Sequence, residues 1–454
     1  MPTIAVYGAT AYTSREHLLP YLINHADSAS YTLILAGRSK AKLDALNESL
    51  GKAGADRRSV VATTLEDAAG VAALVGKSDI VINFAGPYQL YNAPALIDAC
   101  VTAGKHYLDL TGESHYVANQ VVPKFDFAAA KSGSVVIPMS GFDCIPGDLV
   151  IYHGLRTLQN KLGKGVAFAE STNFYEIGGG ISGGTLASVS AAAEAEEKTD
   201  ISDEWILTGA SVTGPTPRPQ LVYTPPAKVP NVPSYGAFFV GYIVNRTAIR
   251  RSWYLSRMTH PGPAHADNVP NGVAPSADFG FEPRHGDHTV FKESLAGFGK
   301  VRFSNSITAA LVSLSFFVFA GLYMGLKFVR DLLKPYIPPP GTGPTKEVCE
   351  KGFTKITNVS VSDGDKPVAV VSRYDGKGDP GYYHTARVLA ESALSLVLPA
   401  PKGTALPPLA HVGGVLTGPS ALGMVLVERM RIHGVATITS EIVEVGAAES
   451  KKDI

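Results

Sequence analysis

Up to about residue 141, short apolar runs rich in β-branched residues alternate with amphipathic stretches. The strand candidates are TIAVYG, YTLILAGR, SVVATTL, SDIVINFAG, HYLDLTG and SVVIPMSG. Helix-like segments begin between them, near Tyr12, Ser39, Glu66, Ala93 and Ser114. Near-continuous apolar strands separated by helices are typical of a parallel sheet covered on both faces. The pattern predicts an α/β fold that opens with a Rossmann-type, doubly wound domain over residues 1–145.

The pattern changes after residue 145 and predicts a second, mixed α+β domain over residues 146–410. Residues 214–233 contain seven prolines, which suits an extended surface crossing and excludes a central strand or helix. The run KITNVSVSDGDKPVAVVSRY alternates apolar and polar residues on either side of a DGD turn, as an antiparallel hairpin does. Residues 411–454 are expected to form a C-terminal helix, which returns toward the first domain, and a tail.

Composition narrows the classes of function. The 454 residues include 40 basic and 40 acidic ones, so no net charge draws the protein toward nucleic acid. The three cysteines lie far apart and form neither a disulfide framework nor a metal-type spacing, which favours a reducing, cytoplasmic setting. The sequence begins without a charged region followed by an apolar one, so a cleaved signal peptide is not expected.

One apolar segment, residues 303–326, contains no charged residue and is flanked by lysines and arginines. Its length would just cross a bilayer core. Three interpretations are open: a helix that docks on a membrane or lipid-droplet surface, a buried or oligomer-contact helix, and a true span. Docking is favoured, because a single crossing would leave the two halves of the second domain on opposite sides of the membrane. An apolar helix is therefore expected within residues 303–334.

The turn after the first strand, GATAYTSR, resembles a dinucleotide-binding turn in position but holds one glycine where three are expected. Gly8 fills the first role, the tight bend from strand to helix. Ala11 and Ser14 stand where the second and third glycines would let the backbone approach a pyrophosphate and the helix pack closely. The amides of Ala11, Tyr12 and Thr13 can still offer a helix N-terminus to phosphate.

The second strand ends in LAGRSKAKL and not in an acidic residue. An Asp or Glu there would hold the ribose 2′-hydroxyl of NAD, whereas Arg38 suits the 2′-phosphate of NADP. Ser39 and Lys42 complete the candidate set at this end of the strand. The sequence therefore predicts NADP(H) as the cofactor.

The loop after the fourth strand, NFAGPYQLY, follows the switch point where an open α/β sheet binds its ligand. Ala85 and Gly86 are small enough to let a dinucleotide pass, and Pro87 stiffens the turn. Tyr88 is then either a proton donor or a wall of the pocket, and its ordinary pKa of about 10 favours the wall.

Carboxylates lie at the ends of later strands. Asp109 and Glu113 in HYLDLTGE and Asp143 in SGFDCIP can polarise a substrate or cap a loop, and capping is favoured for any single one. Tyr88 and Asp143 are the two candidate catalytic residues. A glycine-rich turn at residues 178–184 either approaches a ligand or joins two domains.

No metal site is predicted. The histidines near residue 275, which are His260, His265, His285 and His288, show no recognised ligand spacing and are expected to face solvent. A Ser–His–Asp hydrolase is also unsupported, because the sequence has no G-x-S-x-G motif.

Taken together, eight motifs resemble the saccharopine dehydrogenase-like oxidoreductases, a family that includes trans-acting enoyl reductases. In order along the chain they are VYGATAYTSR, LAGRSKAKL, NFAGPYQLY, HYLDLTGE, SGFDCIPGD, SGGTLAS, DPGYYHTARVLAESAL and GGVLTGPSALG. The resemblance implies an NADP-binding Rossmann domain joined to a mixed α/β domain with substrate and often dimer contacts. Family members associated with membranes or lipid droplets have a counterpart of the apolar segment.

The resemblance also assigns residues. It implies a phosphate-binding turn at Gly8, Thr10, Ala11, Tyr12, Thr13 and Ser14, a 2′-phosphate contact at Arg38, and a nicotinamide-side loop at Ala85, Gly86, Pro87 and Tyr88. The sequence departs from the family at Ala11 and Ser14, where glycine is usual.

The function expected is an NADPH-dependent oxidoreductase that reduces a C=C (enoyl) or C=N bond of an apolar, free or carrier-bound, biosynthetic intermediate. Because the cofactor delivers the hydride, no acid–base pair needs to stand out in the sequence. The alternative is a non-redox enzyme, an isomerase or cyclase, on the same fold. A second alternative is a non-catalytic scaffold on a lipid surface.

Overall fold

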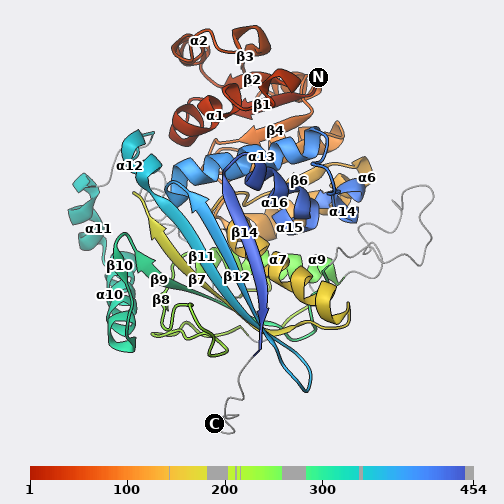
Figure 1. The fold of residues 1–454 in the computed structure, drawn as a ribbon. Helices are drawn as coiled ribbons and strands as arrows, with labels where there is room; N and C mark the ends of the chain where they lie inside the picture. The colour runs from red at the N-terminus through yellow and green to blue at the C-terminus, as the bar shows by residue number, and fades with distance from the viewer. Residues whose placement is uncertain are drawn as a thin grey trace.

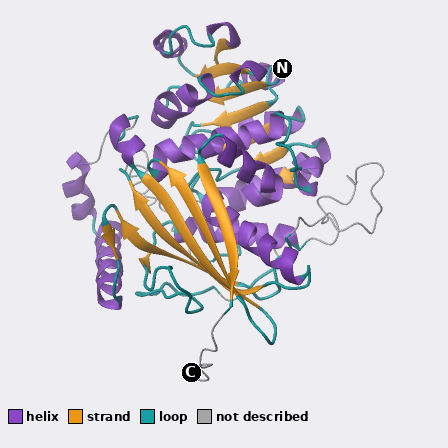
Figure 2. Ribbon diagram, viewed as in Figure 1, coloured by secondary structure: helices purple, strands orange, loops and turns teal. Residues whose placement is uncertain are grey.

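The computed structural model describes residues 1–142, 144–180, 203–209, 212–214, 216–257, 283–336 and 341–444. These residues form two seven-stranded sheets. Helices pack around the first sheet and lie between it and the second (Figures 1 and 2).

The first sheet is parallel throughout the pairs that join its strands. Its order is β13 (Gly414–Val415), β6 (Val135–Ile137), β5 (His106–Asp109), β4 (Ile80–Asn83), β1 (Thr3–Tyr7), β2 (Thr32–Gly37) and β3 (Arg58–Ala62). Alternate residues of β1 enter two different hydrophobic clusters, Ile4 and Val6 in one and Ala5 and Tyr7 in the other. Both faces of the sheet are therefore buried, as its near-continuous apolar strands predict.

Helices follow each of the first strands. They are η1 (Ser14–Leu18), α1 (Leu19–Ile23), α2 (Lys40–Ser49), α3 (Ala68–Gly76), α4 (Ala93–Thr102), α5 (Ser114–Tyr116), η4 (Val117–Val121) and α6 (Val122–Ser132), with short 3₁₀ turns η2 (Ser28–Ser30) and η3 (Ala55–Arg57). The first helix opens as a π-helix, η1, before it continues as α1. The doubly wound α/β fold expected for this part of the chain is confirmed.

The second sheet is mixed. Its order is β10 (Val301–Arg302), β9 (Val290–Phe298), β7 (Phe168–Gly178), β11 (Phe353–Ser362), β12 (Ala369–Lys377) and β14 (Ala436–Val443), and β8 (Ala237–Phe238) also pairs with β9. The expected hairpin is β11 and β12. The proline-rich segment runs as irregular chain, and its Val229 and Val232 pack on Phe174 of β7.

The remaining helices are α7 (Ile145–Leu162), α9 (Tyr242–Ser256), α10 (Ser306–Gly325), α11 (Lys327–Leu333), η5 (Lys334–Tyr336), α12 (Lys346–Lys351), η6 (Pro380–His384), α13 (Thr385–Val397), α14 (Pro408–Val412), α15 (Gly418–Ala421) and α16 (Gly423–Ile432). Helix α7 packs on β11, β12 and β14. Helix α13 packs on β4 and β5 and also on α16, so it joins the two halves of the molecule (Figure 1).

As far as it is described, the C-terminal region holds more than the helix expected within residues 411–454. Residues 445–454, at the end of the expected tail, lie outside the described residues. Besides α15 and α16, the C-terminal region supplies β13 to the first sheet and β14 to the second. Strand β13 has two residues, too few for a periodic signal, and β14 (ATITSEIV) alternates along a sheet edge.

Helix α10 is the expected apolar helix, and it lies along one flank of the molecule next to the edge of the second sheet (Figure 1). Its length and composition would allow it to cross a membrane, yet only 17% of its most apolar stretch is buried inside the protein. The interpretation as a helix buried within this chain is therefore wrong. Membrane docking, an oligomer contact and a true span stay open.

Candidate cofactor-binding site

The turn at Gly8 meets the loop after β4. Gly8 has a φ of +75°, and a Cβ placed on it would lie 2.9 Å from the backbone nitrogen of Ala85. Only glycine combines this left-handed conformation with so close an approach. The turn and the loop therefore form one continuous edge at the carboxyl ends of β1 and β4, where a doubly wound sheet binds its ligand.

Ala11 and Ser14, the two departures from the glycine pattern, occupy different environments. Ser14 is fully buried, and its hydroxyl has no hydrogen-bond partner among the described residues. It therefore packs inside the domain, as the third residue of the motif does, and does not stand in the path of a phosphate. Ala11 is half-buried, and its amide donates to the Gly8 carbonyl (2.9 Å).

Tyr12 ties the turn to the second half of the chain. Its hydroxyl donates to the carbonyl of Pro344 and lies 3.4 Å from Nε2 of His17. The ring makes edge contacts with His17 and with Tyr382. The Tyr12 side chain thus lies in a contact between the two halves of the chain. Its hydroxyl is therefore not free to bind a phosphate.

Arg15 lies over the turn, a position that motif matching did not single out. Its Nε donates to Oε1 of Glu16 (2.7 Å), and its guanidinium reaches the Thr10 carbonyl (3.5 Å). A half-exposed cation beside a helix N-terminus adds positive potential where a pyrophosphate would bind. Thr13 precedes the first helix in helical conformation and makes no side-chain cap.

Arg38 follows the carboxyl end of β2 and is exposed. Within the described part of the chain, no hydrogen bond or ion pair joins its guanidinium to another residue. Burial and the charge of Glu66 raise the pKa of Tyr7, whereas the positive charge of Arg38 lowers it. Arg38 is thus near the ends of β1 and β2, free to meet a phosphate.

Ser39 and Lys42, which follow Arg38, differ in what their side chains contact. Ser39 caps α2, because its side chain accepts a hydrogen bond from the amide of Lys42. Lys42 itself is exposed one turn into the helix. Of the three, Arg38 is the one at the strand end, and Lys42 is a second cation in the first turn of α2.

The buried side chain of Asn83 holds the loop after β4 in place. Asn83 is buried, and its Oδ1 accepts from the amide of Ala85 (2.9 Å). Gly86 is exposed, and Ala85 and Pro87 are half-exposed, so the three line the surface of the loop. This is the surface along which the sequence places the nicotinamide half of the cofactor.

Tyr88 turns inward under that loop. It is 6% exposed, and its hydroxyl donates to the Asn83 carbonyl (2.9 Å) and accepts from the amide of Leu110 (3.1 Å). Burial, reinforced by the charge of Asp109, raises the pKa of Tyr88 well above its ordinary value. The arrangement suits a supporting wall better than a proton donor.

The carboxylates of Asp109 and Glu113 accept hydrogen bonds that hold the neighbouring loops in place. Asp109 is fully buried and accepts from the amides of Thr111 (2.9 Å) and Met139 (3.2 Å) and from the hydroxyl of Tyr107 (2.9 Å). Burial raises its pKa to about 6. Glu113 accepts from the amides of Tyr88 and Gln89, each at 3.0 Å, and so fixes the nicotinamide-side loop.

The other candidate catalytic residue, Asp143, lies outside the described residues, as do residues 181–184 of the glycine-rich turn and His260 and His265. Of the remaining histidines, His288 is exposed as expected. His285 corrects the expectation, because it is 2% exposed and burial lowers its pKa to about 3. It packs edge-on against Phe291 inside the fold.

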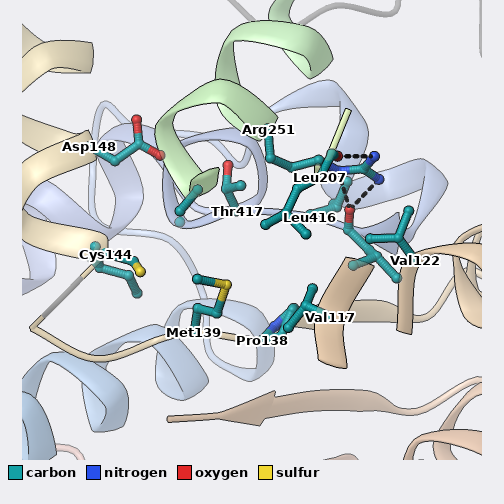
Figure 3. Close-up of a pocket in the computed structure, with 14 residues that line it drawn as sticks. Val117, Val122, Pro138, Met139, Cys144, Asp148, Leu207, Arg251, Leu416 and Thr417 are labelled. Carbon is teal, nitrogen blue, oxygen red and sulfur yellow. Dashed lines mark hydrogen bonds between the residues drawn. The ribbon is translucent and has the colours of Figure 1, made fainter. Parts of the chain in front are cut away.

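A small cavity of about 20 Å³ lies where the first sheet meets α7 and α9 (Figure 3). Such a volume holds about one water molecule. Asp148, Cys144, Met139 and Thr417 line it, and Arg251 is held beside it by the carbonyls of Val415 and Leu207.

Asp148 is the polar group of that cavity. It is 2% exposed, and its Oδ2 accepts a hydrogen bond from the Ser252 hydroxyl. Its Oδ1 has no hydrogen-bond partner in the part of the chain that the structure describes. Burial raises its pKa to about 8. Asp148 is therefore mainly protonated at neutral pH. The cavity is too small for a substrate.

Among the described residues, one group of possible metal ligands comes together: His25, Glu391 and His433. The carboxylate of Glu391 is already engaged. It accepts from Tyr21 (2.5 Å), His25 (2.8 Å) and Nε of Arg429 (2.9 Å). This group is an ion-pair network that links α1 with α13 and α16.

Comparison with known proteins assigns the first domain. Residues 5–137 match the model of the saccharopine dehydrogenase NADP binding domain. The chain carries a saccharopine dehydrogenase NADP-binding domain. The expected family resemblance and the choice of NADP(H) as cofactor are confirmed by this match.

Relatives extend over the whole chain. A Mycobacterium tuberculosis protein whose name contains the words trans-acting enoyl reductase is 28% identical over 97% of both chains. A trans-acting enoyl reductase of Mycobacterium ulcerans is 26% identical and is covered over 98% of its length. The apo, histidine-tagged saccharopine dehydrogenase (L-Glu forming) of Saccharomyces cerevisiae shares the fold, with a TM-score of 0.50, 11% identity and coverage of 98% and 100% of the two chains.

The NADP-binding domain has the residues that such a cofactor needs. The bare backbone at Gly8, the inward-facing Ser14 and the unengaged Arg38 together leave the turn open to a pyrophosphate and the strand end open to a 2′-phosphate. The methyl group of Ala11 is the one side-chain atom added at the position of close approach. The residues present therefore fit NADP(H).

Proposed function

We propose that this protein is an NADPH-dependent reductase that acts on the C=C bond of an apolar enoyl intermediate. Two findings support the proposal. Residues 5–137 match an NADP-binding domain, and nearly the full chain aligns with trans-acting enoyl reductases. The left-handed turn at Gly8 and the exposed Arg38 support the proposal. A non-redox relative would have no reason to keep Arg38 free of hydrogen bonds and ion pairs with other described residues at the strand end.

Bound NADPH supplies the hydride in such a reaction. The chain's own residues bind and orient it. The turn at Gly8 would receive the pyrophosphate at the start of the first helix, and Arg38 would hold the 2′-phosphate. Ala85, Gly86 and Pro87 would border the nicotinamide, on a loop that hydrogen bonds from Tyr88 to Glu113 and from Ala85 to Asn83 hold in place.

We do not assign the proton donor to Tyr88, since its hydroxyl is committed to backbone groups. Asp143 stays a candidate catalytic residue by its place in the sequence. We further propose that the enoyl group arrives as a thioester on a carrier, as the description trans-acting suggests for the relatives.

The test uses the purified full chain. NADPH fluorescence measures binding, and the loss of NADPH absorbance measures turnover with an enoyl thioester, with the saturated thioester as the matched control. We expect binding, together with oxidation that depends on the enoyl group. Absence of binding at millimolar NADPH would overturn the reductase and favour the isomerase or cyclase. Binding without oxidation of any enoyl thioester would overturn the choice of an enoyl substrate.

The carrier is tested separately. The same enoyl group is offered on pantetheine and on an acyl carrier protein. A higher kcat/KM for the carrier-bound form is the expected result, and equal values would argue for a free substrate.

A further inference from the structure

An exposed apolar stripe runs the length of α10. It consists of Ile307, Leu311, Leu314, Val318 and Leu322, which are between 44% and 72% exposed. The spacing of three and four residues places all five on one face of the helix. Phe319, Leu326, Phe328 and Leu332 extend the exposed apolar surface to the side of the stripe and onto α11. A continuous patch of this kind marks an interaction site.

The opposite face of α10 is fixed in the fold. Ser313 is fully buried, donates to the carbonyl of Leu221 (2.7 Å) and accepts from the amide of Phe238 (2.8 Å). Phe316 and Phe317 pack on the ring of Phe238. Crossing a bilayer would require the helix to leave these partners. The contacts therefore favour a helix that stays on the protein and offers one face outward.

Two hydroxyl groups of α10 form hydrogen bonds within the helix and its cap. The hydroxyl of Ser315 donates to the carbonyl of Leu311 (2.8 Å). Asn305 caps the helix and accepts from the amide (2.9 Å) and hydroxyl (3.1 Å) of Thr308. This face can enter an apolar environment without leaving those hydroxyl groups unpaired.

Cations border the patch at both ends. Lys300 and Arg302 precede α10, and Lys327, Arg330 and Lys334 follow it, whereas Asp331 is the one acidic residue from 300 to 336. Lys300, Lys327 and Lys334 are exposed, and no ion pair within the described ranges engages them. Each such lysine near an anionic leaflet adds attraction.

We propose that α10 and α11 dock this protein on the surface of a membrane leaflet that contains anionic lipid, with α10 lying in the plane of the interface. The stripe enters the boundary of the acyl chains, and the lysines meet the headgroups. A second copy of this chain fits the patch less well, because the lysine borders of two copies would repel each other. The inference is independent of the proposed reductase activity.

The test is co-sedimentation of the full chain with vesicles of phosphatidylcholine containing about one quarter phosphatidylserine. We expect the protein to bind these vesicles, to bind pure phosphatidylcholine vesicles at least tenfold more weakly, and to lose binding as salt is raised. The variant Leu314→Glu/Val318→Glu should bind at least tenfold more weakly than the wild type. Its matched control is Leu162→Glu/Ile432→Glu, which changes two exposed apolar residues away from α10 and should bind as the wild type does.

Two further measurements keep the proposal falsifiable. Lys327→Glu/Lys334→Glu should weaken binding to the anionic vesicles only. NADPH binding and circular dichroism of all variants should match the wild type, because the altered side chains are exposed. Equal binding by the stripe variant and its control would overturn the proposal, as would failure of the wild type to bind. So would resistance to extraction at alkaline pH, which indicates a span, or a dimer that the stripe substitutions dissociate.

Discussion

At the scale of single residues, the two replaced glycines have unequal consequences. Ser14 faces the interior with an unpaired hydroxyl, so its position bears on stability more than on the cofactor. Ala11 stands at the surface of the turn, so its methyl group bears on cofactor affinity. The sequence pattern alone could not separate the two, because it does not show which way each side chain points.

This distinction predicts different results for two substitutions. Ser14→Ala removes a buried hydroxyl without a partner and should raise the free energy of unfolding by about 1 kcal/mol, with NADPH affinity unchanged. Ala11→Gly should instead strengthen NADPH binding. Urea unfolding and fluorescence titration measure the two effects. A gain in NADPH affinity on Ser14→Ala would contradict the inward orientation.

Arg38 carries the expected preference for the 2′-phosphate. Arg38→Ala should weaken NADPH binding by roughly 10- to 100-fold, the cost of one charge-assisted contact, and leave NADH binding nearly unchanged. Lys40→Ala is the control, since Lys40 lies two residues further along the chain, is exposed at the start of α2 and already pairs with Asp44. Equal weakening of both cofactors by Arg38→Ala would remove the case for 2′-phosphate recognition.

At the scale of elements, long periodic segments could be predicted and short or distant ones could not. The strands from β1 to β6 and the β11–β12 hairpin stand out because their apolar residues repeat over several positions. Likewise, Gly8, Arg38 and Ala85 to Pro87 follow from their places at strand ends. The contacts of Tyr12 with Pro344 and of Tyr88 with Asn83 depend on tertiary packing, which no local pattern encodes.

The ion-pair network around Glu391 joins three helices, α1, α13 and α16. Burial alone would raise the pKa of Glu391, but hydrogen bonds from His25 and Tyr21 and the charge of Arg429 lower it on balance. The stabilisation from this carboxylate is therefore complete above its unfolded pKa of 4.5 and is lost as the pH falls through the lower folded value.

Arg429→Met should consequently destabilise the protein by about 3 kcal/mol at pH 7, because it leaves a buried carboxylate without its cation. Arg431→Met on the same helix is the control. Arg431 pairs with Glu428 at the surface, and its loss should leave the free energy of unfolding nearly unchanged. Similar losses in the two variants would show that the network does not join α1 to α16.

At the scale of the whole molecule, Asp148 lies where segments from distant parts of the chain meet. Its raised pKa of about 8 means that the folded state keeps a proton that the unfolded state has lost above about pH 4. The contribution of Asp148 to the free energy of unfolding therefore falls as the pH rises from about 4 to about 8.

Asp148→Asn removes this dependence. Relative to the wild type, the variant should gain roughly 2–4 kcal/mol of stability between pH 5 and pH 8. Urea unfolding of both proteins at the two pH values gives the comparison, and Asp375→Asn, at an exposed residue, serves as the control. A difference between variant and wild type that does not change with pH would contradict a protonated Asp148.

The crossing of the chain between its two sheets has a consequence for synthesis. The edge strand of the first sheet comes from residues 414–415, and the last strand of the second sheet comes after it. The nucleotide-binding domain therefore cannot complete its edge while it emerges from the ribosome, and must wait until the second sheet is almost entirely made. We expect the two halves to reach their final state together, as one late event, rather than one after the other during translation.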